Sequence, residues 1–132
     1  MSKLQYFELV DDHVEYRPTG DLSLAQATQL ITSGIALARE RQVMNLMVVT
    51  PGLTGFQPPN VIDRFHFITE WAKAAADSVH VAVVALPEMI DPYKFGATVA
   101  FNLGFTSDVF TSEEEALSWL RSHSKWVRWK SA

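Results

Sequence analysis

An almost unbroken apolar segment, Val79 to Leu86, is the feature that most limits what this chain can fold into. A strand with one face in water alternates apolar and polar side chains, whereas this segment is apolar at nearly every position. Strands of this kind lie inside parallel sheets, where helices cover both faces. The segment therefore predicts an α/β domain, with the strand ending at Pro87.

Four further segments have the composition of strands. Leu4 to Val10 and His13 to Arg17 are rich in strand-forming residues, and the two aspartates between them favour a turn, which predicts a β-hairpin. Val43 to Thr50 predicts a buried strand, and Asp108 to Phe110 predicts a short strand at the edge of the sheet.

Helix-start signals precede the first two predicted helices. Ser23 and Gln26 have the spacing of a capping box, and the apolar stripe that follows contains Gly34, which predicts close packing of this helix on the sheet. Asn60 and Asp63 repeat the start signal for a second helix, which we expect to extend from residue 61 to about residue 76.

Similar signals predict two helices in the last third of the chain. Asp91-Pro92 has the pattern of an N-cap followed by proline in the first turn, and Gly104 is typical of a helix end. Thr111 and Glu114 have the spacing of another capping box, which predicts a fourth helix.

The predicted order is β-β-α-β-α-β-α-β-α. This alternation implies right-handed crossovers and a mostly parallel five-stranded sheet with helices packed on it. No internal repeat or linker is visible, so we expect residues 1–132 to form a single domain. The composition changes only in residues 121–132, a basic, tryptophan-rich tail.

The composition excludes several classes of function. The 132 residues include no cysteine, which excludes disulfides, thiolate chemistry and cysteine-ligated metal sites. The formal net charge of −4 argues against general nucleic-acid binding, which depends on Lys and Arg. The N-terminus lacks the apolar run of a signal peptide, and Val81 to Pro87 is too short to span a bilayer. We therefore expect a cytoplasmic protein without a membrane span.

Several stretches resemble a known family. Pro18 to Leu30 is similar to the strand, Gly-Asp and helix opening of STAS domains, the anti-anti-sigma-factor fold. Other stretches resemble the SpoIIAA-like group of small STAS/SEC14-like bacterial proteins; they are Thr54 to Pro59, Asp63-Arg64, Glu70 to Ala72, and Glu88 to Pro92 with Phe95-Gly96. The resemblance implies a STAS/SpoIIAA-like fold over nearly the whole chain and a regulatory, non-enzymatic role.

In STAS anti-anti-sigma factors, the loop after the third strand carries a phosphorylated hydroxyl, and phosphorylation abolishes binding to a kinase partner. The corresponding loop here is Thr50 to Pro59, in which Thr54 precedes Gly55 but the usual acidic residue is missing. The resemblance thus implies Thr54 as the phosphosite, while the departure favours a shaped contact surface.

We expect three segments to meet at one edge of the sheet: Thr19 to Ser23, Thr50 to Asn60, and Glu88 to Asp91. Their meeting predicts a binding site for a protein partner or a small ligand, and a homodimer is one candidate assembly. The predicted site residues are Asp21, Thr50, Thr54, Gly55, Phe56, Pro58, Asn60, Arg64, Glu88 and Asp91.

No catalytic set is evident around this edge. Arg64 is a candidate donor to an anion, or simply part of a capped and solvated helix start. Glu88 and Asp91 form a candidate acid–base pair, although helix capping explains Asp91 as well. His13, His80 and His123 lack metal-ligand spacing and fit surface or hydrogen-bonded core positions. We therefore predict a binding module with no enzymatic activity, no cofactor and no metal ion.

Aromatic residues leave two interpretations open. They could line an apolar pocket for a metabolite or lipid, or they could fill the core between helices and sheet. The residues concerned are Phe56, Phe65, Phe67, Trp71, Phe95 and Phe101. The tail Lys125 to Lys130 interleaves cations with tryptophans, which suits nucleic acid or an anionic membrane, or else an extended or frayed terminus packed on the domain.

Overall fold

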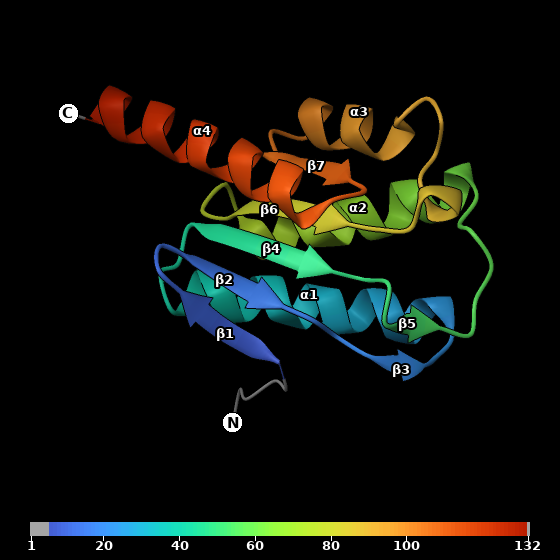
Figure 1. Cartoon of the computed structure of the whole chain (residues 1–132). Helices are drawn as coiled ribbons and strands as arrows, with labels where there is room; N and C mark the ends of the chain where they lie inside the picture. The colour runs from blue at the N-terminus through green and yellow to red at the C-terminus, as the bar shows by residue number, and fades with distance from the viewer. Residues whose placement is uncertain (1–5, 132) are drawn as a thin grey trace.

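The computed structural model describes residues 6–131 of the chain, with side chains as far as His123. A five-stranded sheet lies at its centre (Figure 1). The strand order is β1 (Phe7–Val10), β2 (His13–Tyr16), β4 (Asn45–Val49), β6 (His80–Val84) and β7 (Ser107–Phe110). β1 runs antiparallel to β2, and the other neighbouring strands are parallel. The α/β class, the hairpin and the mostly parallel sheet are confirmed.

A second, two-stranded sheet was not predicted. β3 (Gly20–Asp21) pairs in parallel with β5 (Leu53–Thr54). The pairing continues past the strand ends, because the Leu22 amide donates to the Thr54 carbonyl at 2.7 Å. These short strands join two of the three segments that we expected to meet at one edge.

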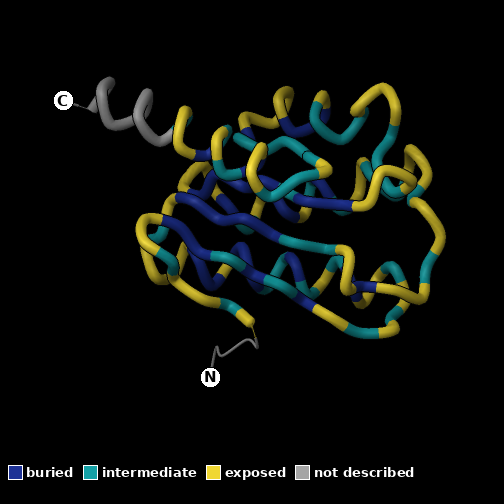
Figure 2. The backbone as a smooth tube through the Cα atoms, viewed as in Figure 1, coloured by how far each residue is buried: buried dark blue, intermediate teal, exposed yellow. Residues whose placement is uncertain are grey.

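Helices cover both faces of the main sheet. α1 (Leu24–Glu40), α2 (Val61–Ala75) and α3 (Phe95–Asn102) build the larger core on one face, and α4 (Glu113–Ser131) builds a smaller core on the other. β4 shows the division: Leu46 and Val48 belong to the larger core, whereas Met47, between them, belongs to the smaller one. This alternation explains why the interior strands are apolar after their first residues, Asn45 and His80, and lie in the deeply buried part of the chain (Figure 2).

Gly34 brings α1 close to the sheet, as predicted. A Cβ atom added at Gly34 would lie 2.6 Å from Cδ2 of Tyr16 on β2. Tyr16 is itself almost fully buried, and its ring makes an edge contact with Phe7 at a centroid distance of 5.7 Å. Only glycine at this position lets the tyrosine ring lie against the helix backbone.

Two predicted helix starts are confirmed in detail. Ser23 with Gln26 and Asn60 with Asp63 each form a complete capping box, in which both reciprocal hydrogen bonds are present.

The other two helix starts were predicted wrongly. α3 begins at Phe95, after Lys94 in a left-handed conformation, and not after Asp91. The Asp91 carboxylate instead closes a turn by accepting from the amides of Tyr93 and Phe95. Before α4, the hydroxyl of Ser112, not that of Thr111, accepts from the amide of Glu115.

The predicted tail is continuous with α4, whose backbone is helical as far as Ser131. The extended form that we considered for it is therefore wrong, while its tryptophan side chains from residue 124 onward lie outside the described residues. Within the described part of the chain, no helix is both long and apolar enough to cross a bilayer.

Candidate functional site

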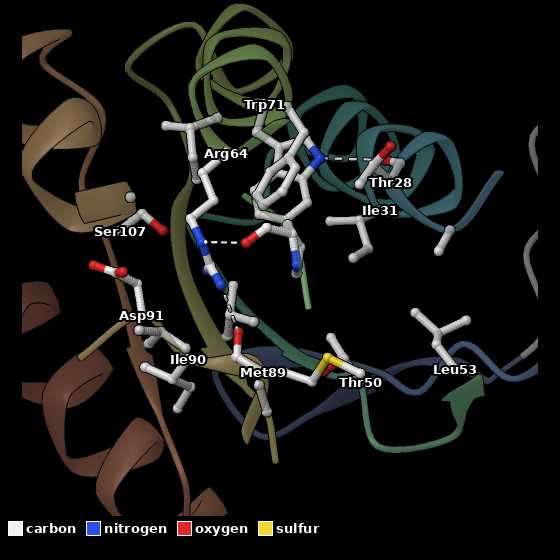
Figure 3. Close-up of a pocket in the computed structure, with 18 of the residues that line it drawn as sticks. Thr28, Ile31, Thr50, Leu53, Arg64, Trp71, Met89, Ile90, Asp91 and Ser107 are labelled. Carbon is white, nitrogen blue, oxygen red and sulfur yellow. Dashed lines mark hydrogen bonds between the residues drawn. The ribbon is translucent and has the colours of Figure 1, made fainter. Parts of the chain in front are cut away.

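A largely apolar cavity of about 130 Å³ lies beside the carboxyl ends of β4 and β6 (Figure 3). α1 and α2 form its walls, together with the loops that follow the two strands and part of β7. This edge of a parallel sheet is where α/β proteins commonly bind ligands. The principal wall residues are Ala27, Thr28, Ile31, Thr50, Phe56, Phe67, Ile68, Trp71, Val83 and Ala85.

The polar atoms of the inner wall are already engaged with the protein. The indole Nε1 of Trp71 donates to the Thr28 carbonyl at 3.2 Å, which ties α2 to α1. The Thr50 hydroxyl donates to the Val84 carbonyl at 2.9 Å. The inner part of the cavity therefore offers a ligand mainly apolar contact.

Charged groups enter the lining from α2, from the segment that precedes α3 and from β7. Arg64, in the first turns of α2, donates from Nε to the Pro59 carbonyl at 3.1 Å and from Nη2 to the Met89 carbonyl at 3.2 Å. Burial lowers the pKa of the Arg64 guanidinium below its ordinary value, while the charges of Asp91 and Asp63 oppose that effect. Among the described residues, no carboxylate forms a direct ion pair with this guanidinium.

Asp91 also satisfies its charge with backbone groups. Its Oδ2 accepts from the Tyr93 amide at 3.1 Å and from the Phe95 amide at 2.9 Å. The two remaining charged residues of the lining neutralise each other, since Lys94 Nζ lies 3.0 Å from Asp108 Oδ1. Figure 3 shows Arg64 extending from α2 toward Met89, with Asp91 on one side and Thr28 and Ile31 on the other.

The loop Thr50 to Pro59 forms one side of the cavity, and a glycine fixes its path. Gly55 has φ +103°, and a Cβ atom there would lie 2.5 Å from the Leu22 carbonyl oxygen. The next residue, Phe56, packs against the larger core and lines the cavity. The conformation of Gly55 therefore allows Phe56 to reach the pocket while the chain passes beside Leu22.

The structure brings only some of the predicted site residues into the cavity. Thr50, Phe56, Arg64 and Asp91 line it. The others lie outside its lining: Asp21, Thr54 and Gly55 at the two-stranded sheet, Asn60 at the cap of α2, and Pro58 and Glu88 on the exposed surface.

The hydroxyl of Thr54 is exposed and faces an acidic side chain. Its Oγ1 lies 3.4 Å from Oδ1 of Asp21 and 3.5 Å from the Gly20 carbonyl. A phosphate on Thr54 would meet the like charge of Asp21. Thr54 thus has an acidic neighbour in space, Asp21, which comes from another segment of the sequence.

Both interpretations of the aromatic residues hold in part. Phe56, Phe67 and Trp71 line the cavity, and the last two rings pack together at a centroid distance of 4.6 Å. Phe95 packs against the larger core. The prediction is wrong for the remaining two, because Phe65 and Phe101 are exposed.

Other lining residues escaped the sequence prediction. Lys94 and Asp108, 14 residues apart, form an ion pair. Met89 contributes its backbone carbonyl, which any residue type would supply. Thr28 was not distinguished from the rest of the first helix, although its carbonyl receives the Trp71 indole. No local pattern marks these roles, because each depends on a partner distant in sequence.

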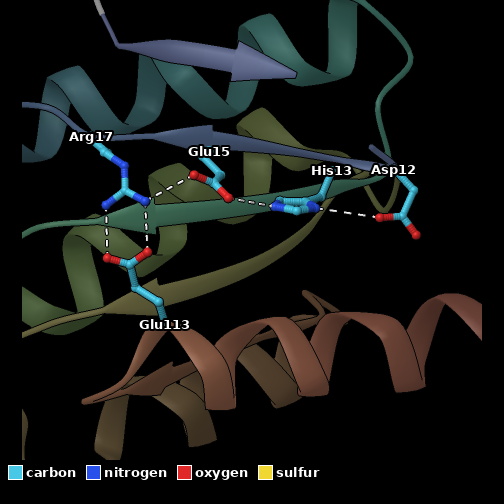
Figure 4. A network of polar contacts seen from close by, with 5 residues as sticks. All are labelled: Asp12, His13, Glu15, Arg17 and Glu113. Atoms are coloured by element: carbon cyan, nitrogen blue, oxygen red, sulfur yellow. Dashed lines mark hydrogen bonds and ion pairs between the residues drawn. The ribbon is translucent and has the colours of Figure 1, made fainter. Parts of the chain in front are cut away.

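The histidines lie on the opposite face of the sheet or on the surface. His13 is buried, and its Nε2 lies 3.0 Å from Oε2 of Glu15. The polar contacts continue from Glu15 through Arg17 to Glu113 (Figure 4). His80 is also buried, but among the described residues its Nδ1 has no hydrogen-bond partner, so the prediction of a satisfied core position is wrong for this atom. No group of three or more residues suited to hold a metal ion occurs among the described residues.

Comparisons of this chain with protein-family models, with curated proteins and with solved structures found no significant match.

Proposed function

We propose that this protein is a non-enzymatic binding module of the STAS/SpoIIAA-like kind, whose pocket takes a small ligand with an apolar body. The cavity beside β4 and β6 is the observation that carries the proposal. Its volume of about 130 Å³ is close to that of an engineered apolar cavity, ~150 Å³, which binds benzene. The inner wall offers no unengaged indole or threonine donor, so an apolar group loses little by replacing solvent there.

The size of the cavity limits the ligand. Sites for drug-sized molecules usually enclose about 300–1,000 Å³. A cavity of about 130 Å³ instead suits a single ring or a short branched chain. The metabolite form of the pocket hypothesis therefore fits better than a long-chain lipid held entirely inside.

Toluene is a suitable first probe, because it tests the apolar inner part of the cavity without involving the charged residues. We call this inner part the apolar chamber. We expect toluene to raise the melting temperature of the protein in a concentration-dependent way, by linkage of binding to folding. Ala97→Leu, which adds volume at a lining position, should remove this shift. Ala25→Leu is the matched control, since Ala25 is exposed on α1 and lies outside this lining. Absence of a toluene shift in the unmodified protein would refute the pocket proposal.

A second candidate function is association with a protein partner at the start of α2. Val61, Ile62 and Phe65 are exposed within the first two turns of this helix, directly after the loop Thr50 to Pro59. Exposed large apolar residues that lie close together commonly mark interaction surfaces. The same surface is available to a partner protein or to a second copy of the chain.

Phe65→Ser tests this second candidate. We expect it to reduce the recovery of a specific partner from the native host, or to reduce self-association in analytical ultracentrifugation. Phe101→Ser is the matched control, because Phe101 is also exposed but lies near the end of α3. Equal effects of the two substitutions would argue against a specific surface at α2.

A further inference from the structure

Two opposite charges in the lining of the cavity are each held by backbone groups, not by one another. Arg64 donates to the carbonyls of Pro59 and Met89, and Asp91 accepts from the amides of Tyr93 and Phe95. They interact through space, but no direct ion pair joins them within the described residues. Both side chains are partly buried. The cavity thus presents a fixed positive and a fixed negative group together with an apolar chamber.

Both groups retain capacity to bind. A guanidinium has five N–H donors, and the two hydrogen bonds to Pro59 and Met89 leave the others available. Both backbone bonds of Asp91 fall on Oδ2, and among the described residues nothing donates to Oδ1. A carboxylate on Arg64 and an ammonium on Asp91 would each form a charge-assisted hydrogen bond.

The other charges of the lining do not change this balance. Lys94 and Asp108 pair with each other at 3.0 Å, and Lys94 Nζ also lies 5.5 Å from the centre of the Phe110 ring. The charged residues of the lining therefore sum to zero, two positive and two negative. A ligand with a single negative charge would gain from Arg64 but be opposed by Asp91, whereas a ligand with both charges complements both groups.

From this arrangement we infer that the ligand is a small zwitterion with an apolar tail, of the chemical class of an apolar α-amino acid. Its carboxylate binds Arg64, its ammonium binds Asp91, and its side chain enters the chamber walled by Ile31, Phe67 and Trp71. The chamber volume favours an isobutyl-sized or phenyl-sized side chain over an indole. This inference rests on the proposed function, because it assigns the polar end of a ligand whose apolar end occupies the same cavity.

Calorimetric titration with phenylalanine, leucine and single-charge analogues tests the inference. Phenylpropanoate lacks the ammonium, and phenylethylamine lacks the carboxylate. We expect phenylalanine or leucine to bind at least about tenfold more tightly than either analogue, since each analogue leaves one charged protein group without its partner. Tryptophan should bind more weakly than phenylalanine because of its larger ring.

Two conservative substitutions assign the charges separately. Asp91→Asn keeps an oxygen acceptor for the amides of Tyr93 and Phe95. We expect it to weaken the binding of phenylalanine by about tenfold without weakening the binding of phenylpropanoate. Arg64→Gln should weaken the binding of phenylalanine to a similar extent without weakening the binding of phenylethylamine. Toluene should bind both variants as it binds the unmodified protein, which verifies that the chamber is intact. Glu88→Gln and Lys73→Gln are the matched controls, because both residues are exposed and lie outside the lining.

The outcomes separate the two proposals. If toluene binds but phenylpropanoate binds as tightly as phenylalanine or more tightly, the zwitterion inference is wrong and the apolar pocket stands. The same conclusion follows if toluene binds and Asp91→Asn leaves the affinity for phenylalanine unchanged. If toluene binds and no amino acid does, the inference is again wrong. If toluene does not bind, the pocket function itself is refuted, and the zwitterion inference that rests on it falls too.

Discussion

Arg17 and Glu113, 96 residues apart in the sequence, form a bidentate ion pair that joins the start of α4 to the residue directly after β2. Nη1 of Arg17 donates to Oε2 of Glu113 at 2.9 Å, and Nη2 donates to Oε1 at 2.7 Å. Arg17 also binds Glu15 at 3.0 Å, and Glu15 in turn binds the buried His13 (Figure 4). Because α4 is the helix that covers the second face of the sheet, this pair helps to set where that helix begins.

The first prediction concerns Glu113→Gln. Hydrogen bonding to Arg17 holds the pKa of Glu113 below its ordinary value of 4.5, and hydrogen bonding to His13 does the same for Glu15. A lowered carboxyl pKa stabilises the fold above about pH 4.5, and this stabilisation is lost as the pH falls through the folded-state pKa. Both partners are about two-fifths exposed, so we expect the substitution to cost at most about 1 kcal/mol at neutral pH.

Urea unfolding at a series of pH values measures this difference. The difference in unfolding free energy between the unmodified protein and Glu113→Gln, called the gap below, should be constant at neutral pH. It should shrink as the pH falls into the acidic range. Glu114→Gln, which removes the same charge from the same turn of α4, is the control and should show a smaller gap. A gap that does not change with pH would contradict the role assigned to the ion pair.

The second prediction concerns His80, whose titration affects stability in a higher pH range. Burial and the nearby His123 lower the pKa of His80 below its ordinary value of 6.5. The fold is therefore most stable above about pH 6.5 and loses this contribution as the pH falls through the folded-state pKa. His80→Leu removes both the charge and the unpartnered Nδ1, so we expect its melting temperature to fall less on acidification.

Melting temperatures measured between about pH 7.5 and pH 5.5 test this expectation, because an ordinary histidine titrates in this range. His66→Gln is the matched control, since it removes a histidine that is exposed on α2 and lies outside the core. An unchanged pH dependence in His80→Leu would show that other groups dominate this window.

The third prediction concerns the contact between α1 and β2. Gly34→Ala should destabilise the protein by about 1–3 kcal/mol, the usual cost of inserting a methyl group into a packed core. The added Cβ would lie 2.6 Å from Tyr16, whose ring is almost fully buried and also contacts Phe7, so it has little room to move. Gly96→Ala in α3 is the control, because its Cβ would meet Ile68 at an ordinary 3.6 Å. Chemical denaturation of both variants decides whether the close approach, rather than the loss of a helical glycine, matters.

The fourth prediction concerns the loop beside the cavity. Gly55→Ala combines an unfavourable φ of +103° with a 2.5 Å contact to the Leu22 carbonyl, so we expect a loss of at least about 1–3 kcal/mol and weaker toluene binding. Gly104→Ala also has a positive φ, +72°, but its Cβ meets nothing closer than 3.7 Å. The Gly104 variant should lose less stability and retain toluene binding. Equal losses in the two variants would mean that backbone strain alone accounts for the effect.

Much of the fold could be predicted because its signals are local. A capping box joins residues three apart, as in Ser23 with Gln26 and Asn60 with Asp63, and both boxes form. Local signals failed where one side chain suits two structures. Asp91 before Pro92 fits a helix cap or a turn, and the two hydroxyls at Thr111 and Ser112 offer alternative caps one residue apart.

The candidate site was predictable in its position but not in its composition. Three loops were expected at the carboxyl edge of the sheet, and residues from two of them, Thr50 and Asp91, line the cavity there. The third joins this edge through the β3–β5 pairing, which rests on backbone hydrogen bonds over two-residue strands that carry no recognisable pattern. Exposed Glu88 and Pro58 were included because sequence does not indicate on which side of a loop a residue points.

The sequence by itself determined the order of the α-helices and the main-sheet strands, the buried interior strands and the helix starts at Ser23 and Asn60, because these follow from spacing along one segment. Only the tertiary structure decided that Phe67 and Trp71 face a cavity while Phe65 faces solvent, and that Arg64 and Asp91 share its lining without pairing. Such choices depend on distant backbone groups, such as the Met89 carbonyl that receives Arg64 and the Thr28 carbonyl that receives Trp71. Every residue type carries the same carbonyl, so these contacts exist only once the chain has folded.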